Sequence, residues 1–160
     1  MLQKVRSKKV RATGAFAIVA SKYNTRFVDA MLQAAKGEIV RAGGKVQVVR
    51  VPGAYEIPVV AARLARSHDF AGIICLGVIL RGATTHAQHI GEAVSDALMQ
   101  LQIQYEVPVI HEVLLLENQQ QAVERCLNKK HNRGMEAAQT ALEMARVMAS
   151  LKSPLDDIPF

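Results

Sequence analysis

The stretch AGIICLGVIL, from Ala71 to Leu80, decides the fold class because it contains no polar side chain. A continuous apolar run of this length, too short to cross a membrane, is typical of a β-strand covered on both faces, as in a parallel sheet. Working outward along the chain, three further runs predict strands at residues 15–20, 46–51 and 108–116. The four runs together predict a parallel sheet.

Helical patterns separate these predicted strands. Apolar residues spaced three or four apart follow Asn24, which can cap a helix, and a second helix can begin at Pro58 and run through Leu64. Similar patterns cover 86–101, 119–127 and 135–149. Strands that alternate with helices predict an α/β fold, here a flavodoxin-like three-layer α/β/α sandwich with a four-stranded parallel sheet.

The expected organisation is one domain over residues 15–152, between a basic arm (1–14) and a C-terminal tail (153–160). The last helix is rich in Ala and Met, which suits packing against another subunit as readily as packing on its own sheet. We therefore expect a homo-oligomer. Neither a membrane-spanning run nor a signal peptide is recognisable, so we expect a cytoplasmic protein.

Charge and cysteine content argue against nucleic acid as a partner and against a metal site or a disulfide framework. The formal net charge is +6. Much of it comes from basic residues near the start, namely Lys4, Arg6, Lys8, Lys9 and Arg11. Without interleaved aromatic residues, a solvated tail is favoured over a nucleic-acid-binding arm. Cys75 and Cys126 have no metal-ligand or disulfide spacing and are interpreted as reduced thiols, and the histidines show no metal-binding pattern.

Ligands of an open parallel sheet bind beyond the carboxyl ends of its strands, which directs attention to the residues after each run. The turn from Gly82 to Thr85 leads from a strand into a helix, so its N–H groups can bind phosphate or carboxylate. Thr84 can equally act only as a helix cap. A lone histidine is usually structural, but His86 stands next to this predicted anion site and can relay protons near neutral pH.

Two further charged features have both a structural and a functional interpretation. Glu56 can complement a helix dipole, or it can accept hydrogen bonds from the hydroxyl groups of a polyol. The basic turn that contains Arg125, Lys129 and Arg133 can be a solvated patch, or it can bring a guanidinium group to a phosphate.

Taken in order, several motifs resemble those of the lumazine synthase family. They are KYN (22–24), VPGAYEIP (51–58), LGVILRGATTH (76–86), VPVI (107–110), QAVER (121–125), NRG (132–134) and EAA (136–138). VPGAYEIP followed about twenty residues later by RGATTH is a specific pairing. The resemblance covers nearly the whole chain, from about Ala15 to Leu151.

The resemblance implies the penultimate step of riboflavin synthesis. In that step 5-amino-6-(D-ribitylamino)uracil condenses with 3,4-dihydroxy-2-butanone 4-phosphate to give 6,7-dimethyl-8-ribityllumazine, phosphate and water, without metal or organic cofactor. It also implies a homo-oligomer built from pentamers, with riboflavin synthase as a further candidate partner. His86 would transfer protons, and the implied substrate-binding residues are Tyr23, Ala54, Tyr55, Glu56, Val78, Ile79, Leu80, Ala83, Thr84, His111 and Arg125.

The chain departs from the family pattern in three places. His111 stands where the family commonly has a Phe that a neighbouring subunit supplies to the ring site. The stretch 114–117 lacks the usual Thr residues, and the turn after Arg125 lacks the usual glycines. These departures motivate an alternative, a weakly active or non-catalytic paralogue that binds flavin or lumazine or forms a shell. A flavodoxin-like electron carrier is disfavoured, because no Ser/Thr/Gly-rich phosphate loop follows the first predicted strand.

Overall fold

The computed structural model describes residues 11–151, which form an α/β fold around one four-stranded, all-parallel sheet. The strand order is β2-β1-β3-β4. The strands are β1 (Ala15–Ser21), β2 (Lys45–Val51), β3 (Gly72–Leu80) and β4 (Val109–Leu116), and the main helices are α1 (Thr25–Arg41), α2 (Ile57–Ser67), α3 (His86–Tyr105) and α5 (Arg133–Ser150). Shorter turns are η1 (Ala54–Glu56), α4 (Gln119–Ala122) and the π-helical turn η2 (Val123–Leu127). The predicted C-terminal tail and most of the basic arm lie outside the described residues.

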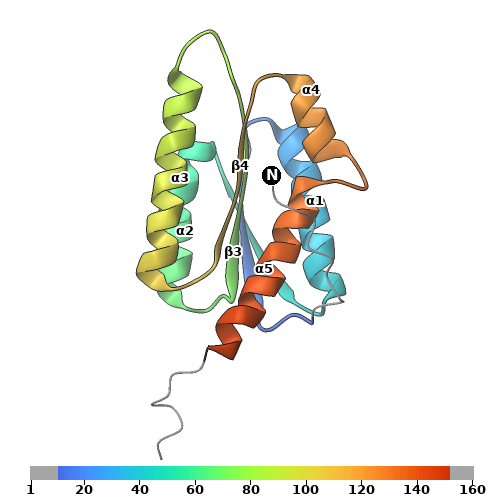
Figure 1. The fold of residues 1–160 in the computed structure, drawn as a ribbon, viewed down its shortest axis with the longest axis vertical. Helices are drawn as coiled ribbons and strands as arrows, with labels where there is room; N and C mark the ends of the chain where they lie inside the picture. Colours follow the sequence, from blue (N-terminus) through green and yellow to red (C-terminus); the bar gives the residue numbers. More distant parts are fainter. Residues whose placement is uncertain (1–10, 152–160) are drawn as a thin grey trace, which may run out of the picture.

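Helices cover both faces of the sheet, which confirms the predicted three layers. Helices α2 and α3 lie on one face, and α1, α4 and α5 lie on the other (Figure 1). Because successive residues of a strand point to opposite faces, β1 feeds both cores: Phe16 and Ile18 pack in the layer of α1 and α5, and Ala17 and Val19 in the layer of α2 and α3. The apolar runs of the sequence are continuous for this reason.

Helix α5 packs closely against its own subunit. It buries Ala137, Ala138, Ala141 and Ala145 in the core that α1 also lines. At its first turn, Gly134 lies so close to α1 that an added Cβ would overlap the backbone carbonyl of Met31. The small residues of α5 are therefore used within the chain. Exposed apolar side chains among the described residues include Val59 of α2, Met99 and Ile103 of α3, and Val147 of α5.

Most predicted ends of helices and strands are close to the observed ones, but the start of α1 is not capped in the way that the sequence predicts. Asn24 occupies the N-cap position of α1, but its side chain does not cap the helix. Its backbone is left-handed, with φ of 55°, and the capping expectation is wrong because the side-chain amide is used elsewhere. At the other end Gly43 takes the left-handed conformation, with φ of 86°, that commonly ends a helix. Helix α2 is longer than predicted and ends at Ser67.

Candidate active site

The loops that follow the four strands are joined by backbone hydrogen bonds at one edge of the sheet. Lys22 N–H donates to the Val51 carbonyl (2.8 Å) and Tyr23 N–H to the Pro52 carbonyl (3.1 Å), which connects the ends of β1 and β2. Arg81 N–H donates to the Leu116 carbonyl (2.8 Å), which connects the ends of β3 and β4. The predicted address of the site is thus a continuous edge made from all four loops.

Asn24 connects the two halves of this edge. Its Nδ2 donates to the Val78 carbonyl (2.7 Å), which joins the loop after β1 to the last residues of β3. The strands β1 and β3 are central neighbours in the sheet. From β1 the chain continues to β2 on one side of this pair, and from β3 it continues to β4 on the other side. Ligands of open α/β sheets bind at this kind of reversal. The side chain expected to cap a helix instead fixes the floor of the predicted site.

Several predicted substrate-binding residues meet at this edge. Tyr23 and Tyr55 are 74% and 65% exposed, so their rings are available to a ligand. Glu56 ends η1, is exposed, and its side chain caps no helix end. The other predicted residues of this group lie in η1, at the end of β3 or in the loop that follows β3, namely Ala54, Val78, Ile79, Leu80, Ala83 and Thr84.

The turn from Gly82 to Thr85 presents unused hydrogen-bond donors. Within residues 11–151, the backbone N–H groups of 82–85 donate to no protein acceptor, and all four residues are exposed. Thr85, not Thr84, occupies the N-cap position of α3, and the Thr84 hydroxyl accepts a long bond (3.4 Å) from His86 N–H. His86 is the first residue of α3 and its side chain is exposed beside these donors.

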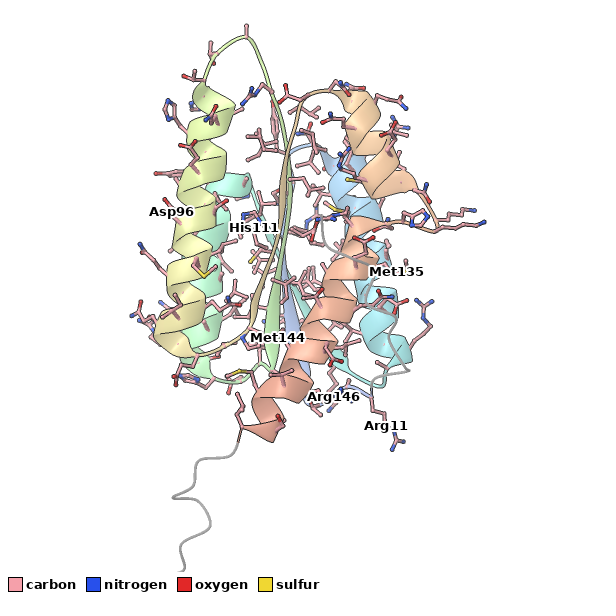
Figure 2. The ribbon with its side chains drawn as sticks, in the orientation of Figure 1. Arg11, Asp96, His111, Met135, Met144 and Arg146 are labelled. Carbon is pink, nitrogen blue, oxygen red and sulfur yellow. The ribbon has the colours of Figure 1, made fainter. Side chains whose placement is uncertain are left out.

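His111 lies apart from this edge. It is the third residue of β4 and faces α3, where its Nε2 is 2.7 Å from the Ser95 hydroxyl (Figure 2). Because Val113 N–H donates to Nδ1 (3.3 Å) and the Ser95 hydroxyl donates to the Gly91 carbonyl (2.7 Å), Nε2 carries the proton. Burial lowers the pKa of His111 below its ordinary value of 6.5, which favours the neutral ring.

Arg125 also lies away from the edge of the sheet, on η2 in the layer of α1 and α5. Its Nη1 donates only a long bond (3.4 Å) to the Gln121 carbonyl of its own turn, and it forms no ion pair within the described part of the chain. Arg133, in contrast, is held between two carboxylates, those of Glu112 and Glu136. Of these two arginines in the basic segment, Arg125 is the one left free for an external anion.

The sequence did not reveal the role of Glu112. Its side chain is 2% exposed on β4, and its carboxylate accepts a hydrogen bond from Arg133 Nε (2.6 Å). Burial raises the pKa of Glu112 to about 6, although the positive charge of Arg133 opposes that rise. A signal was present in the sequence, because Ile110 and Leu114, two residues before and after Glu112, share its face of the strand and are apolar, so this face had to be covered.

We expect replacement of Glu112 by Gln to change how stability depends on pH. A folded-state pKa above the ordinary value of 4.5 means that the contribution of Glu112 to stability is full below pH 4.5 and is lost as the pH rises through 6. The free energy of unfolding of Glu112→Gln minus that of the wild type should therefore rise by about 2 kcal/mol between pH 4.5 and 7. Denaturant unfolding at both pH values measures this difference, and a flat difference would contradict the buried titration.

Other chemistry-bearing groups are not assembled into a second centre. Cys75 and Cys126 are free and buried, and burial raises their pKa values to about 12 and about 11, so both stay as unreactive thiols. Among residues 11–151, no three His, Cys, Asp or Glu side chains gather into a group that could hold a metal ion. Over the same range, no helix has both the length and the apolar character needed to cross a membrane.

Two cavities, of about 380 and 290 Å³, lie elsewhere on the subunit. The first lies between α1 and the turn that joins η2 to α5, and the second is lined by residues near the ends of α2, α3 and α5. Neither is lined by a predicted substrate-binding residue. Most of the predicted residues thus lie at the carboxyl edge of one subunit, although the side chain of Val78 is buried there, and His111 and Arg125 lie on other surfaces.

Comparison with known proteins decides the family. The model of the family described as 6,7-dimethyl-8-ribityllumazine synthase matches residues 14–149. The chain belongs to the 6,7-dimethyl-8-ribityllumazine synthase family. Its relatives of that name include the protein of Aquifex aeolicus (strain VF5), 42% identical over 86% of this chain and 91% of the relative. Those of Desulfotalea psychrophila (strain LSv54 / DSM 12343) and Stenotrophomonas maltophilia (strain R551-3) are 40% and 39% identical, over 86% and 85% of this chain and 90% of each relative.

Membership of the 6,7-dimethyl-8-ribityllumazine synthase family confirms the resemblance found in the sequence motifs. The matched region includes every strand and nearly all of α5, so the family assignment applies to the whole sheet and not to one motif. The individual residue roles stay predictions.

Proposed function

We propose that this lumazine synthase family member condenses 5-amino-6-(D-ribitylamino)uracil with 3,4-dihydroxy-2-butanone 4-phosphate, forming 6,7-dimethyl-8-ribityllumazine, phosphate and water. The observation that supports this most directly is the row of unused N–H groups at 82–85 next to His86, on the same edge as Tyr23 and Glu56. An anion site, a proton-transfer group, an aromatic face and a polyol acceptor are what the two substrates require.

Each substrate has its own set of proposed contacts. Tyr23 stacks on the pyrimidine ring, and Glu56 accepts hydrogen bonds from the ribityl hydroxyl groups. The backbone N–H groups of Ala83 and Thr84 bind the phosphate. His86 transfers protons after the imine has formed. The remaining proposed lining residues are Ala54, Tyr55, Val78, Ile79 and Leu80.

The reaction needs mainly orientation. The amine of one substrate and the ketone of the other react without activation, so holding them together supplies much of the rate. Loss of phosphate then needs a stabilised leaving anion and one modest acid or base. We accordingly propose that no metal or organic cofactor takes part.

We further propose a homo-oligomer built from pentamers, in which a neighbour supplies His111 and Arg125 to the site. Both residues lie away from the carboxyl edge of their own sheet, which suits a role toward another subunit. The exposed side chains of Val59, Met99 and Ile103 on α2 and α3 offer apolar area for the contact. Light scattering of the purified protein distinguishes a pentamer, a decamer and a sixty-subunit shell. Riboflavin synthase as a partner and a cytoplasmic location belong to the same proposal.

Mixing the purified protein with both substrates and following the absorbance of the lumazine product tests the proposed reaction. We expect a clear acceleration over the spontaneous condensation. A rate equal to the spontaneous one would favour the alternative, a non-catalytic paralogue that binds flavin or lumazine, which the departure at His111 motivates.

Replacing Arg125 by Ala should weaken binding of the sugar phosphate more than binding of the pyrimidine. A charge-assisted hydrogen bond contributes about 1.5 to 3 kcal/mol, so the KM for the butanone phosphate should rise by roughly ten-fold or more. The KM for the pyrimidine should change by less than about two-fold. Equal increases in both constants would remove Arg125 from phosphate binding.

A further inference from the structure

Two hydrogen-bonded connections tie the turn that carries Arg125 to the sheet and to α5. Asn132, which is 7% exposed, donates through Nδ2 to the Cys126 carbonyl (2.6 Å), directly after Arg125 in the chain. Its Oδ1 accepts from the N–H groups of Gly134 (2.8 Å) and Met135 (3.3 Å) and so caps α5. The η2 turn is therefore anchored to the first turn of α5.

The first residue of α5 is anchored in turn to β4. Arg133 Nε donates to the buried carboxylate of Glu112 (2.6 Å), and Arg133 Nη1 donates to Glu136 (3.3 Å). An arginine fork held by two carboxylates has little freedom to rotate. The chain of contacts thus runs from Glu112 on the sheet through Arg133 and Asn132 to the turn of Arg125.

We propose that Glu112 is a positioning residue for the sugar phosphate, because its ionised carboxylate holds Arg133 and Asn132 where they fix the direction of Arg125. This inference rests on the phosphate-binding role of Arg125 proposed above. Burying a carboxylate is costly, and an ion pair with one arginine only partly offsets that cost. A site that must hold a guanidinium group to within about 0.5 Å of the position that binds a phosphate gives that cost a function.

Within residues 11–151, the charged and titratable groups that interact with Glu112 lie on α5 and η2. Arg133 and Glu136 act on Glu112 from α5, and the thiol of Cys126 on η2 lies within its electrostatic range. Arg125 acts on Cys126 in the same way. The thiol of Cys126 stays neutral, because burial raises its pKa to about 11. The pKa of Glu112, about 6, therefore places the loss of the ionised pair in mildly acidic solution.

The test compares Glu112→Gln with Glu136→Gln in the full enzyme. Both substitutions remove one carboxylate from Arg133, but only Glu112 connects it to the sheet. At pH 7.5 we expect Glu112→Gln to raise the KM for the butanone phosphate by roughly three- to ten-fold, with the pyrimidine KM and kcat changed by less than about two-fold. Glu136→Gln should leave all three constants within about two-fold of the wild type.

The pH profile gives a readout that general loss of structure would not produce. The phosphate of the substrate itself titrates near pH 6, so both enzymes lose some affinity as the pH falls. The ratio of the variant KM to the wild-type KM removes that shared effect. We expect this ratio to fall toward one between pH 7.5 and 5.5, as the wild type loses its ionised Glu112. A constant ratio would overturn the proposal.

A double variant separates this proposal from the role of Arg125. If Glu112 acts through Arg125, adding Glu112→Gln to Arg125→Ala should raise the phosphate KM no further. Additive increases would overturn positioning through Arg125. An Arg125→Ala enzyme with an unchanged phosphate KM would instead overturn the proposed function of Arg125 itself. Should Glu112→Gln fail to fold, Arg133→Lys keeps the charge but loses the fork, and it must give the same selective rise in KM for the proposal to stand.

Discussion

Gly134→Ala should lower the free energy of unfolding by about 3 kcal/mol or more, the largest effect that we expect from a single methyl group in this protein. An added Cβ would overlap the backbone carbonyl of Met31, and a backbone atom of a packed helix cannot move aside as a flexible side chain can. Helix α5 would have to shift away from α1, which opens the core that both helices line. Thermal unfolding at a fixed protomer concentration should show a midpoint lowered by roughly 10 °C.

Gly37→Ala is the matched control for this prediction. Gly37 lies within α1, and a Cβ added there meets no atom within 4 Å. Alanine in a helix interior is more stable than glycine by about 0.5 to 1 kcal/mol, so this variant should be slightly stabilised. Equal losses of stability in both variants would show that close packing at Gly134 is not the cause.

His86→Ala should slow turnover by roughly ten- to a hundred-fold without abolishing it. A positioned acid or base contributes about a hundred-fold or more in many enzymes, but here the amine and the ketone react unaided, and orientation is left intact by the substitution. His86 begins α3 beside the free N–H groups of 82–85, where a bound phosphate would place the reacting carbons close to it. Steady-state rates with both substrates saturating measure the effect on kcat.

His89→Ala is the control, because this second histidine lies one turn further along α3. Its ring is exposed and contacts the Thr85 hydroxyl (3.3 Å). Turnover of His89→Ala should stay within about two-fold of the wild type. A loss in His86→Ala no larger than that in His89→Ala would exclude His86 from the proton transfers.

The fold could be predicted because its evidence is local. Continuous apolar runs of strand length and helical spacing between them leave few arrangements other than a parallel sheet with helices on both faces. In a parallel sheet the loops after the strands lie at one edge, so the exposed turn at 82–85 and His86 could be located from the sequence, whereas anion binding by this turn stays a prediction. These features depend on neighbours in the chain, which the sequence displays directly.

The interactions that the sequence analysis missed all join residues far apart in the chain. Asn24 has every property of a helix cap, and only the approach of the Val78 carbonyl redirects its amide. Arg125 and Arg133 look alike in a basic turn, but the free and the paired arginine are distinguished by a carboxylate on β4. A pattern of residue types does not reveal such partners, although a charged residue inside an apolar strand indicates where to look.

Successive side chains of β4 point to opposite faces of the sheet, which has a consequence for how mutations act on the enzyme. His111 and Glu112 are adjacent in the chain but point into opposite layers, one toward Ser95 on α3 and the other toward Arg133 on α5. Exchanges at these two positions should therefore act almost independently, so the proposed ring contact of His111 and the proposed positioning of Arg125 through Glu112 can be altered one at a time. Inserting one residue just before them would instead swap both assignments in a single step, sending the imidazole into the arginine's layer and the carboxylate toward the serine.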